Sequence, residues 1–106
     1  MVGPESVLVR SIVQAILREH PDAWVFKVHG SPYQMAGVPD LLVCIHGRLV
    51  AIEVKMPRPG ESLAAALDRA TPGQRHQIAR IRKAGGSAGV VTSVTGVARL
   101  IEDALP

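Results

Sequence analysis

The spacing of apolar residues changes several times along the chain, and each spacing predicts a different element. Near the N-terminus, apolar residues recur at helical intervals and predict a helix over about residues 5–18, with Pro4 at its start and Pro21 beyond its end. Three apolar runs then predict strands at residues 23–28, 41–45 and 49–52. The helix would bury one stripe of side chains, namely Leu8, Val9, Ile12, Ala15 and Ile16.

The second half of the chain predicts a helix, a strand and a closing helix. Thr71-Pro72 is typical of a helix start and Gly85-Gly86 of a helix end. A fourth strand is predicted at residues 88–92 and a last helix at 95–105. The order is α-β-β-β-α-β-α, and strands this apolar need helices on both faces of a mixed sheet, which is an α/β fold. Residues 57–70 mix two prolines and a glycine with an alanine-rich run, so we expect a mobile insertion with a short helical turn or two.

Charged residues stand at the ends of the second and third predicted strands. Asp40 follows Gly37-Val38-Pro39 and opens one strand, whereas Glu53-Val54-Lys55 closes the next. If Gly47-Arg48 forms a two-residue hairpin loop, His46 faces Leu49 and Asp40 faces Lys55. Facing residues share a side of the sheet, as do alternate residues along one strand. Asp40, Glu53 and Lys55 are therefore predicted to converge on one face.

Two acids beside a lysine indicate a metal site with a catalytic ammonium group. Magnesium takes oxygen ligands, which Asp40, Glu53 and the carbonyl of Val54 would supply. A bound cation would neutralise a phosphodiester and lower the pKa of a bound water, while Lys55 orients the water or offsets charge. Hydrolysis of a nucleic-acid backbone is the favoured reaction. The plainer alternative is that Asp40 is a turn residue and that Glu53 and Lys55 form an exposed pair.

Two more polar residues fall on predicted inward stripes, and each leaves two interpretations open. Glu5 either offsets the helix dipole or points a third carboxylate at the same cation. Gln74 either caps a loop or reaches the hairpin to bond Lys55 or a phosphate oxygen.

The size and composition of the chain limit its class. At 106 residues it is expected to form one domain, residues 1–106, and no apolar run approaches the roughly 18 residues of a membrane helix. The N-terminal residues have neither the basic flank nor the apolar core of a signal peptide, so we expect a cytoplasmic protein without a membrane partner. Cys44, the single cysteine, lies within an apolar strand and is expected to be a buried thiol.

Positive charge is concentrated in one segment. The net charge is only +3, but residues 69–101 contain six Lys or Arg and no acid. Such a segment suits a phosphate backbone or, equally, a solvated helix surface. The candidate DNA contacts are Lys27, which is otherwise an exposed strand lysine, together with His29, Tyr33, Arg75 and Arg82.

Taken together, these motifs resemble the PD-(D/E)XK nucleases, and more closely a stand-alone VRR-NUC domain. The matching stretches span nearly the whole chain in the order of the family: Glu5, Val25-Phe26-Lys27-Val28-His29-Gly30, Gly37-Val38-Pro39-Asp40-Leu41-Leu42, Ile52-Glu53-Val54-Lys55, Thr71-Pro72-Gly73-Gln74 and Ala84-Gly85-Gly86.

The resemblance implies a restriction-endonuclease-like α-β-β-β-α-β core with an added C-terminal helix, DNA cleavage that depends on Mg²⁺ or Mn²⁺, and frequently a homodimer. It assigns metal binding to Glu5, Asp40 and Glu53 and catalytic roles to Lys55 and Gln74. Similar domains occur in phage and bacterial proteins and in larger repair nucleases, and some prefer branched DNA. The longer 57–70 segment departs from the family pattern.

The sequence therefore predicts a metal-dependent deoxyribonuclease that selects DNA by structure, such as flaps or junctions, rather than by sequence. Three alternatives stay open at this point. The chain could be a non-catalytic nucleic-acid-binding module of the same fold, a sequence-specific restriction-type endonuclease, or an assembly subunit with a fortuitous acidic site.

Overall fold

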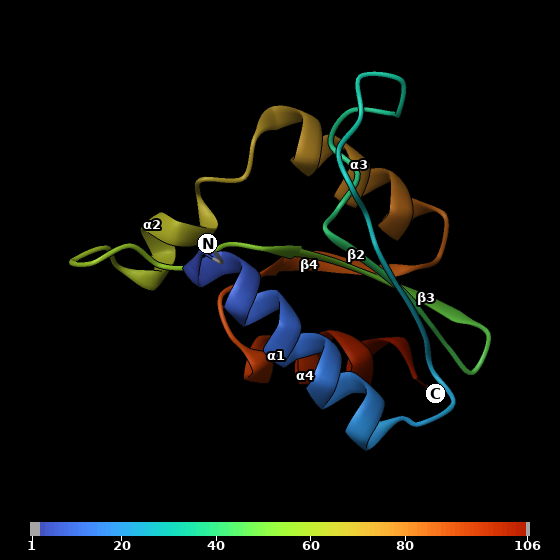
Figure 1. Cartoon of the computed structure of the whole chain (residues 1–106). Coiled ribbons are helices and arrows are strands. Elements are labelled where there is room, and N and C mark those ends of the chain that lie inside the picture. The colour runs from blue at the N-terminus through green and yellow to red at the C-terminus, as the bar shows by residue number, and fades with distance from the viewer. Residues whose placement is uncertain (1–2, 106) are drawn as a thin grey trace.

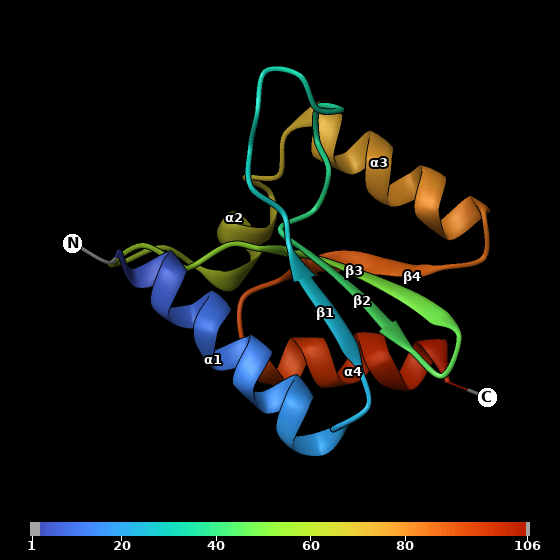
Figure 2. The ribbon, with the colours of Figure 1, turned by 45° about the vertical axis from the view of Figure 1, so that its right-hand side comes forward.

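The computed structural model describes residues 3–105 and shows a four-stranded sheet between helices (Figures 1 and 2). The predicted order of the major elements is confirmed, and a short helix lies within residues 57–70. The elements are α1 (Pro4–Glu19), β1 (Trp24–Lys27), β2 (Leu41–Ile45), β3 (Arg48–Val54), α2 (Leu63–Leu67), α3 (Pro72–Lys83), β4 (Ser87–Val91) and α4 (Val94–Ala104). Among residues 3–105, no helix combines the length and the apolar character needed to cross a membrane.

The sheet is mixed, as predicted, because its last strand returns through a helical crossover. The strand order is β1-β2-β3-β4; the first two pairs are antiparallel and the β3–β4 pair is parallel. Helix α3 supplies the crossover, and parallel neighbours require a connection of this kind.

Helices α1 and α4 cover one face of the sheet and enclose most of the core with it (Figure 2). The predicted stripe of α1 is confirmed, since Val9, Ile12 and Ile16 are buried. The inward side chains of the sheet on this face are equally buried, and they are Leu41, Val43, Ile45, Val50, Ile52, Val54 and Val91. Burial of this apolar surface is the main stabilising contribution to the fold.

The opposite face of the sheet is only partly covered. Helix α3 packs on β3 and β4 around a small cluster of Ala51, Ile78 and Ala88. The half of this face that belongs to β1 and β2 carries exposed side chains, including Cys44. The expectation of a buried Cys44 thiol is therefore wrong, because α3 does not extend over β2 at this position.

The register of the β2–β3 hairpin differs from the predicted one by two residues. Ile45 pairs with Arg48, so the loop consists of His46 and Gly47. Both loop residues have positive φ, 49° and 76°, which is the requirement of a type I′ turn. Both registers keep the same side chains on the buried face of the sheet, so only the turn distinguishes them. Continued by one pair, the observed register sets Asp40 opposite Glu53 rather than opposite Lys55.

The long β1–β2 loop is fastened to the start of α3 by a glycine contact. Gly37 has φ +80° and lies directly against Gly73, so a Cβ on Gly37 would overlap the backbone of Gly73. Two residues further on, Pro39 is buried and Asp40 begins the hairpin. The contact thus sets the position of Asp40 relative to α3.

The segment 57–70 is folded back on itself through Arg69. The Arg69 guanidinium donates to both carboxylate oxygens of Glu61 and to the carbonyl of Met56. Ser62 caps α2, and Ala66 within that helix is buried. The predicted short helix is confirmed.

We predict that the Gly37–Gly73 contact makes Gly37 sensitive to substitution. Gly37→Ala should lower the free energy of unfolding by more than the roughly 1–2 kcal/mol of a positive φ alone, because the new Cβ also meets backbone. Urea denaturation measures the change.

Two glycines of the same chain serve as controls. Gly47→Ala has a positive φ but open space, and Gly30→Ala has neither strain nor a neighbour within 4 Å. The order of destabilisation should be Gly37, then Gly47, then Gly30. Equal effects at Gly37 and Gly47 would contradict the contact.

Candidate active site

Asp40 is held at the point where the β2–β3 ladder ends. Its Oδ2 accepts a hydrogen bond from the amide of Val54 at 2.7 Å, while its own carbonyl accepts from the amide of Val28 at 2.8 Å. In a continued β2–β3 ladder, the amide of Val54 would donate to a backbone carbonyl. Here the side chain of Asp40 accepts that hydrogen bond instead. Because both bonds involve strand ends, the orientation of Asp40 is tied to the sheet.

Glu53 is a buried carboxylate on the same face, and only 2% of the residue is exposed. Its Oε2 accepts a hydrogen bond from Nε2 of Gln74 at 3.0 Å and lies 3.4 Å from Nζ of Lys55. Its Oε1 is buried without a hydrogen-bond partner. A buried polar oxygen left unpaired is costly, so this atom requires an explanation.

The electrostatics of the pair favour a proton or a cation at Glu53. Burial, followed by repulsion from Asp40, raises the pKa of Glu53 from 4.5 to about 7, although Lys55 acts in the opposite direction. Two nearby carboxylates in a site sheltered from water resist simultaneous ionisation. When both carboxylates are ionised, Asp40 and Glu53 carry two negative charges and Lys55 supplies only one positive charge.

Gln74 caps α3 and also reaches the hairpin, but its partner there is Glu53 rather than the predicted Lys55. It occupies the third position of α3, where its Oε1 accepts from the amide of Thr71 in a capping box. Its Nε2 donates to Oε2 of Glu53. The helix cap thereby fixes the amide that orients the buried carboxylate.

Asp40 and Glu53 fit a divalent cation. A hard cation takes carboxylate oxygens, usually one or two together with waters and substrate phosphate. The orphaned Oε1 of Glu53 is a buried ligand atom of the right chemistry, beside a second carboxylate that is fixed by Val54. Within residues 3–105, no three His, Cys, Asp or Glu side chains gather closely enough to form a fuller ligand set.

The structure does not bring Glu5 into this cluster. Glu5 lies in the first turn of α1 and is exposed, although it was expected on the inward stripe. An acid at this position offsets the positive end of the helix dipole. Val54 is fully buried at the end of β3, next to Glu53, and its carbonyl stays a predicted ligand.

The predicted DNA contacts of the first half of the chain lie in different places. Lys27 is exposed, and its register partner Leu41 belongs to the face opposite Asp40 and Glu53. His29 and Tyr33 lie in the β1–β2 loop, and Tyr33 is 97% exposed. A DNA strand bound at the acidic cluster could therefore reach Lys27 only by passing around the edge of the sheet.

The two predicted arginines of α3 already bond within the chain. Arg75 donates to the carbonyls of Ala70 and Asp68, and Arg82 donates to the carbonyl of Ala88. Sequence reasoning passed over Arg80, which lines a groove beside β3 together with Gln77. The available signal was helical spacing, because Arg80 is three residues beyond Gln77, which is itself three residues beyond Gln74.

Comparison with known proteins identifies the same family as the motifs do. The VRR-NUC domain family model matches residues 2–95. A solved structure described as a VRR_NUC domain superposes with a TM-score of 0.63 at 26% identity, covering 94% of this chain and 97% of that one. A second, described as a VRR_NUC domain protein, has a TM-score of 0.55 at 24% identity and covers 92% and 88%, which supports the fold alone. The search of curated proteins found no match.

We predict that the stability of the metal-free protein falls as the pH rises through the site. The folded state binds the proton of Glu53 more tightly than the unfolded state does, with pKa values of about 7 and 4.5. This contribution to stability is full below pH 4.5 and disappears as the pH rises to about 7. Urea denaturation in the presence of a chelator should show the decline.

The control for this prediction is Glu53→Gln, which cannot ionise. Its stability should lack this pH-dependent component, and Mg²⁺ at pH 8 should stabilise the wild type more than the variant. A constant difference between the two proteins from pH 4.5 to 8 would contradict the raised pKa.

Proposed function

The chain belongs to the VRR-NUC family of nuclease-type domains, and from this premise we propose that it is a metal-dependent deoxyribonuclease that hydrolyses DNA phosphodiester bonds. One observation carries the proposal. The buried Oε1 of Glu53 has no protein partner and stands in a cluster with Asp40 and Lys55, where a cation would complete it. A buried carboxylate oxygen without a partner requires an explanation, and a bound cation supplies one.

The residues divide the chemistry among themselves. Asp40 and Glu53 would hold Mg²⁺ or Mn²⁺, which when bound neutralises phosphate charge and lowers the pKa of a bound water. Lys55, with its side chain 14% exposed and its ammonium beside Glu53, can reach both the carboxylates and the solvent side of the site. It would orient the attacking water or offset charge that develops on the phosphate.

Gln74 acts through Glu53 and is a positioning residue. Its amide donor keeps Oε2 of Glu53 occupied, so that Oε1 is the oxygen left to face a ligand. A side chain anchored in a helix cap holds this orientation without further reorganisation.

We also propose that the enzyme selects DNA by structure rather than by sequence. Contacts to phosphate position a protein without reading bases, and the exposed charges of this chain are suited to such contacts. The resemblance to VRR-NUC domains also implies a homodimer, which stays a prediction that sedimentation of the purified protein tests.

We predict that Asp40→Asn, Glu53→Gln and Lys55→Met each lower the cleavage rate by about 10²-fold or more, because each removes a group that would hold the cation or act on the reacting water and phosphate. The assay compares blunt duplex, flap, junction and single-stranded DNA with Mg²⁺, Mn²⁺ or a chelator at one salt concentration.

Glu102→Gln, an exposed acid on α4, is the matched control and should cleave normally. Binding without cleavage under any divalent ion would favour the non-catalytic module. Discrete fragments from a long duplex would favour the restriction-type enzyme. Normal cleavage by Glu53→Gln would assign the cluster to structure alone.

We further predict that substitutions of Gln74 and Thr71 distinguish the positioning of Glu53 from the stability of the helix cap. Thr71→Ala loses the cap hydroxyl at a cost of about 1 kcal/mol, but keeps the donor to Glu53. Gln74→Ala loses both the cap and that donor, so it should lose stability and also about 10-fold or more in kcat. Parallel urea and cleavage measurements make the comparison, and equal kcat values in the two variants would contradict the positioning role.

A further inference from the structure

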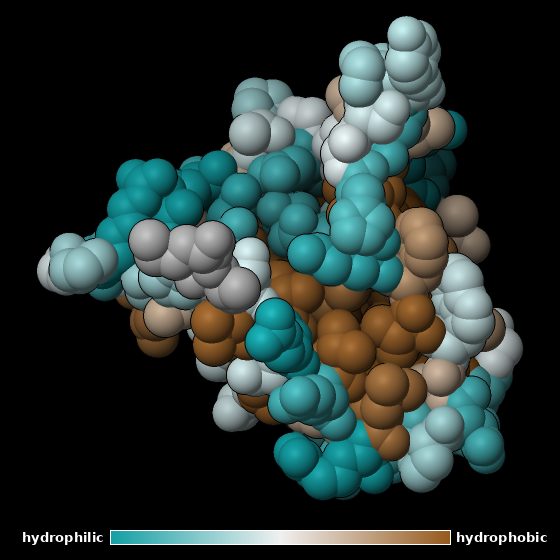
Figure 3. All heavy atoms as spheres, viewed as in Figure 1, coloured by the Kyte–Doolittle hydropathy of each residue, from teal (hydrophilic) through white to brown (hydrophobic). Residues whose placement is uncertain are grey.

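The uncovered half of the sheet carries an aromatic pair. Trp24 and Phe26 project from β1 with 58% and 46% of their surface exposed, and their rings stack with centroids 5.8 Å apart and planes 9° from parallel. Trp24 pairs with Cys44 on β2, and Cys44 pairs with Leu49 on β3. Leu49 is 40% exposed. Figure 3 shows hydrophobic atoms at the surface between α1 and β1, below the hydrophilic β1–β2 loop. Large exposed apolar groups that lie together mark a binding surface.

The pair shares its face with the active site. Phe26 is the register partner of Leu42, and Leu42 lies two residues from Asp40 on the same strand. Side chains two residues apart point to the same face at a spacing of about 7 Å along the strand. Phe26 is therefore one strand across and about one such step along from Asp40, and Trp24 is about two steps along.

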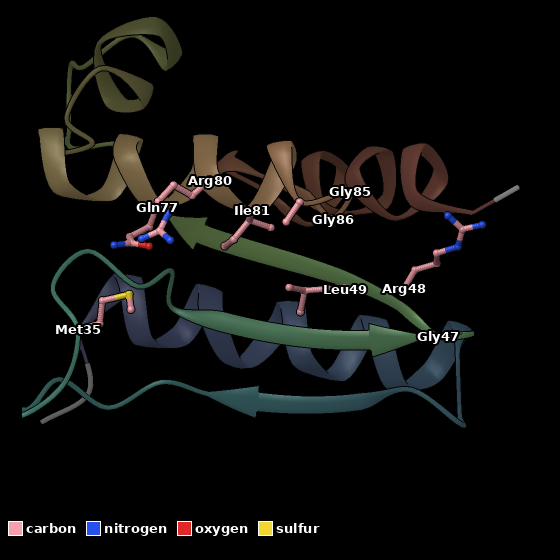
Figure 4. Close-up of a pocket in the computed structure, with 10 residues that line it drawn as sticks. Met35, Gly47, Arg48, Leu49, Gln77, Arg80, Ile81, Gly85 and Gly86 are labelled. Carbon is pink, nitrogen blue, oxygen red and sulfur yellow. The ribbon is translucent and has the colours of Figure 1, made fainter.

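A groove of about 640 Å³ runs along the same face between α3 and the β2–β3 hairpin. Figure 4 shows Gln77, Arg80 and Ile81 on its α3 side, Leu49 on β3, and Arg48 at the hairpin end. No Asp or Glu lines it, so its charge complements a phosphate backbone. In the same view α1 lies behind β1 and β2, and no helix lies in front of them.

We propose that Trp24 and Phe26 stack on unpaired bases of the DNA strand that enters the active site, while the backbone of that strand follows the groove past Arg80 and Arg48. This inference rests on the proposed function and assigns its substrate: DNA with a single-stranded segment next to the cleaved phosphate. Stacking on aromatic side chains is indifferent to base identity but requires the base to be unpaired. A paired duplex offers no such face.

The position of the pair favours DNA over a protein partner. A partner seated on Trp24 and Phe26 would begin about one step of 7 Å along the strands from Asp40, on the face from which DNA would approach. Such a partner would also narrow access to the groove that Leu49 lines. A second copy of the chain on this surface is the alternative outcome of the test.

The chain supplies its own probes, because Trp24 is its one tryptophan and Cys44, the register partner of Trp24, is its one cysteine. In metal-free buffer, a 12-nucleotide oligothymidylate should quench the Trp24 fluorescence and slow alkylation of Cys44. A blunt 12-base-pair duplex at equal occupancy, measured by anisotropy, should do neither. Absence of quenching and protection while the oligothymidylate is bound would overturn the proposal, as would absence of binding.

Variants test the same claim independently of fluorescence. Trp24→Leu and Phe26→Leu should each weaken oligothymidylate binding about fivefold or more and leave duplex binding within twofold, whereas Trp24→Phe keeps an aromatic face and its affinity. Leu63→Ser, a change at an equally exposed apolar residue on α2, should have no effect. Arg80→Gln should reduce the salt dependence of binding by about one phosphate contact.

If the variants weaken oligothymidylate and duplex binding equally, the aromatic pair serves the fold rather than base stacking. If they change only the sedimentation of the protein, the surface binds a second copy of the chain. Because binding is measured without metal, its result is separate from cleavage. Cleavage without Trp24 quenching would refute this inference alone, and quenching without cleavage would refute only the proposed activity.

Discussion

The pairing of Asp40 with Glu53 across the β2–β3 hairpin is the constraint on which the rest of the site depends. Two carboxylates repel each other, and they stay together because the strands that carry them are clamped by the core on the opposite face, where Leu41, Ile52 and Val54 are fully buried. The two acids could separate only if the hydrogen bonds between β2 and β3 and the packing of these core side chains were broken. The hydrophobic core thereby maintains an electrostatically unfavourable arrangement that becomes favourable when a cation is bound.

The two faces of the sheet are used for different purposes. One face is filled by α1 and α4 and supplies stability, whereas the other is covered by a single helix over β3 and β4. The partly open face holds the acidic cluster, the basic groove and the aromatic pair. Helix α3 links these features, since Gln74 at its start orients Glu53 and Arg80 further along lines the groove. In the proposed enzyme, substrate binding and chemistry would thus depend on one helix and its cap.

Glu53 shows how the proposed metal binding would lower the stability of the metal-free protein. Its burial sharpens its interaction with any bound cation, since the surrounding dielectric is low, but the same burial raises its pKa and leaves Oε1 unpaired in the protein alone. A leucine of similar size would stabilise the sheet and abolish the site. Strained or unsatisfied groups of this kind are expected where a protein must bind something.

The sequence by itself determined the element order, the mixed sheet and the gathering of Asp40, Glu53 and Lys55 on one face. That last prediction survived a register error because side chains in a strand alternate with period two, and the error was two residues. Only the tertiary structure decided the partner of Gln74, the exposure of Cys44 and the aromatic pair, the bonds of Arg75 and Arg82, and the separation of Glu5 from the cluster. These depend on where α3 crosses the sheet and where the β1–β2 loop docks, which long-range packing sets and local patterns do not encode.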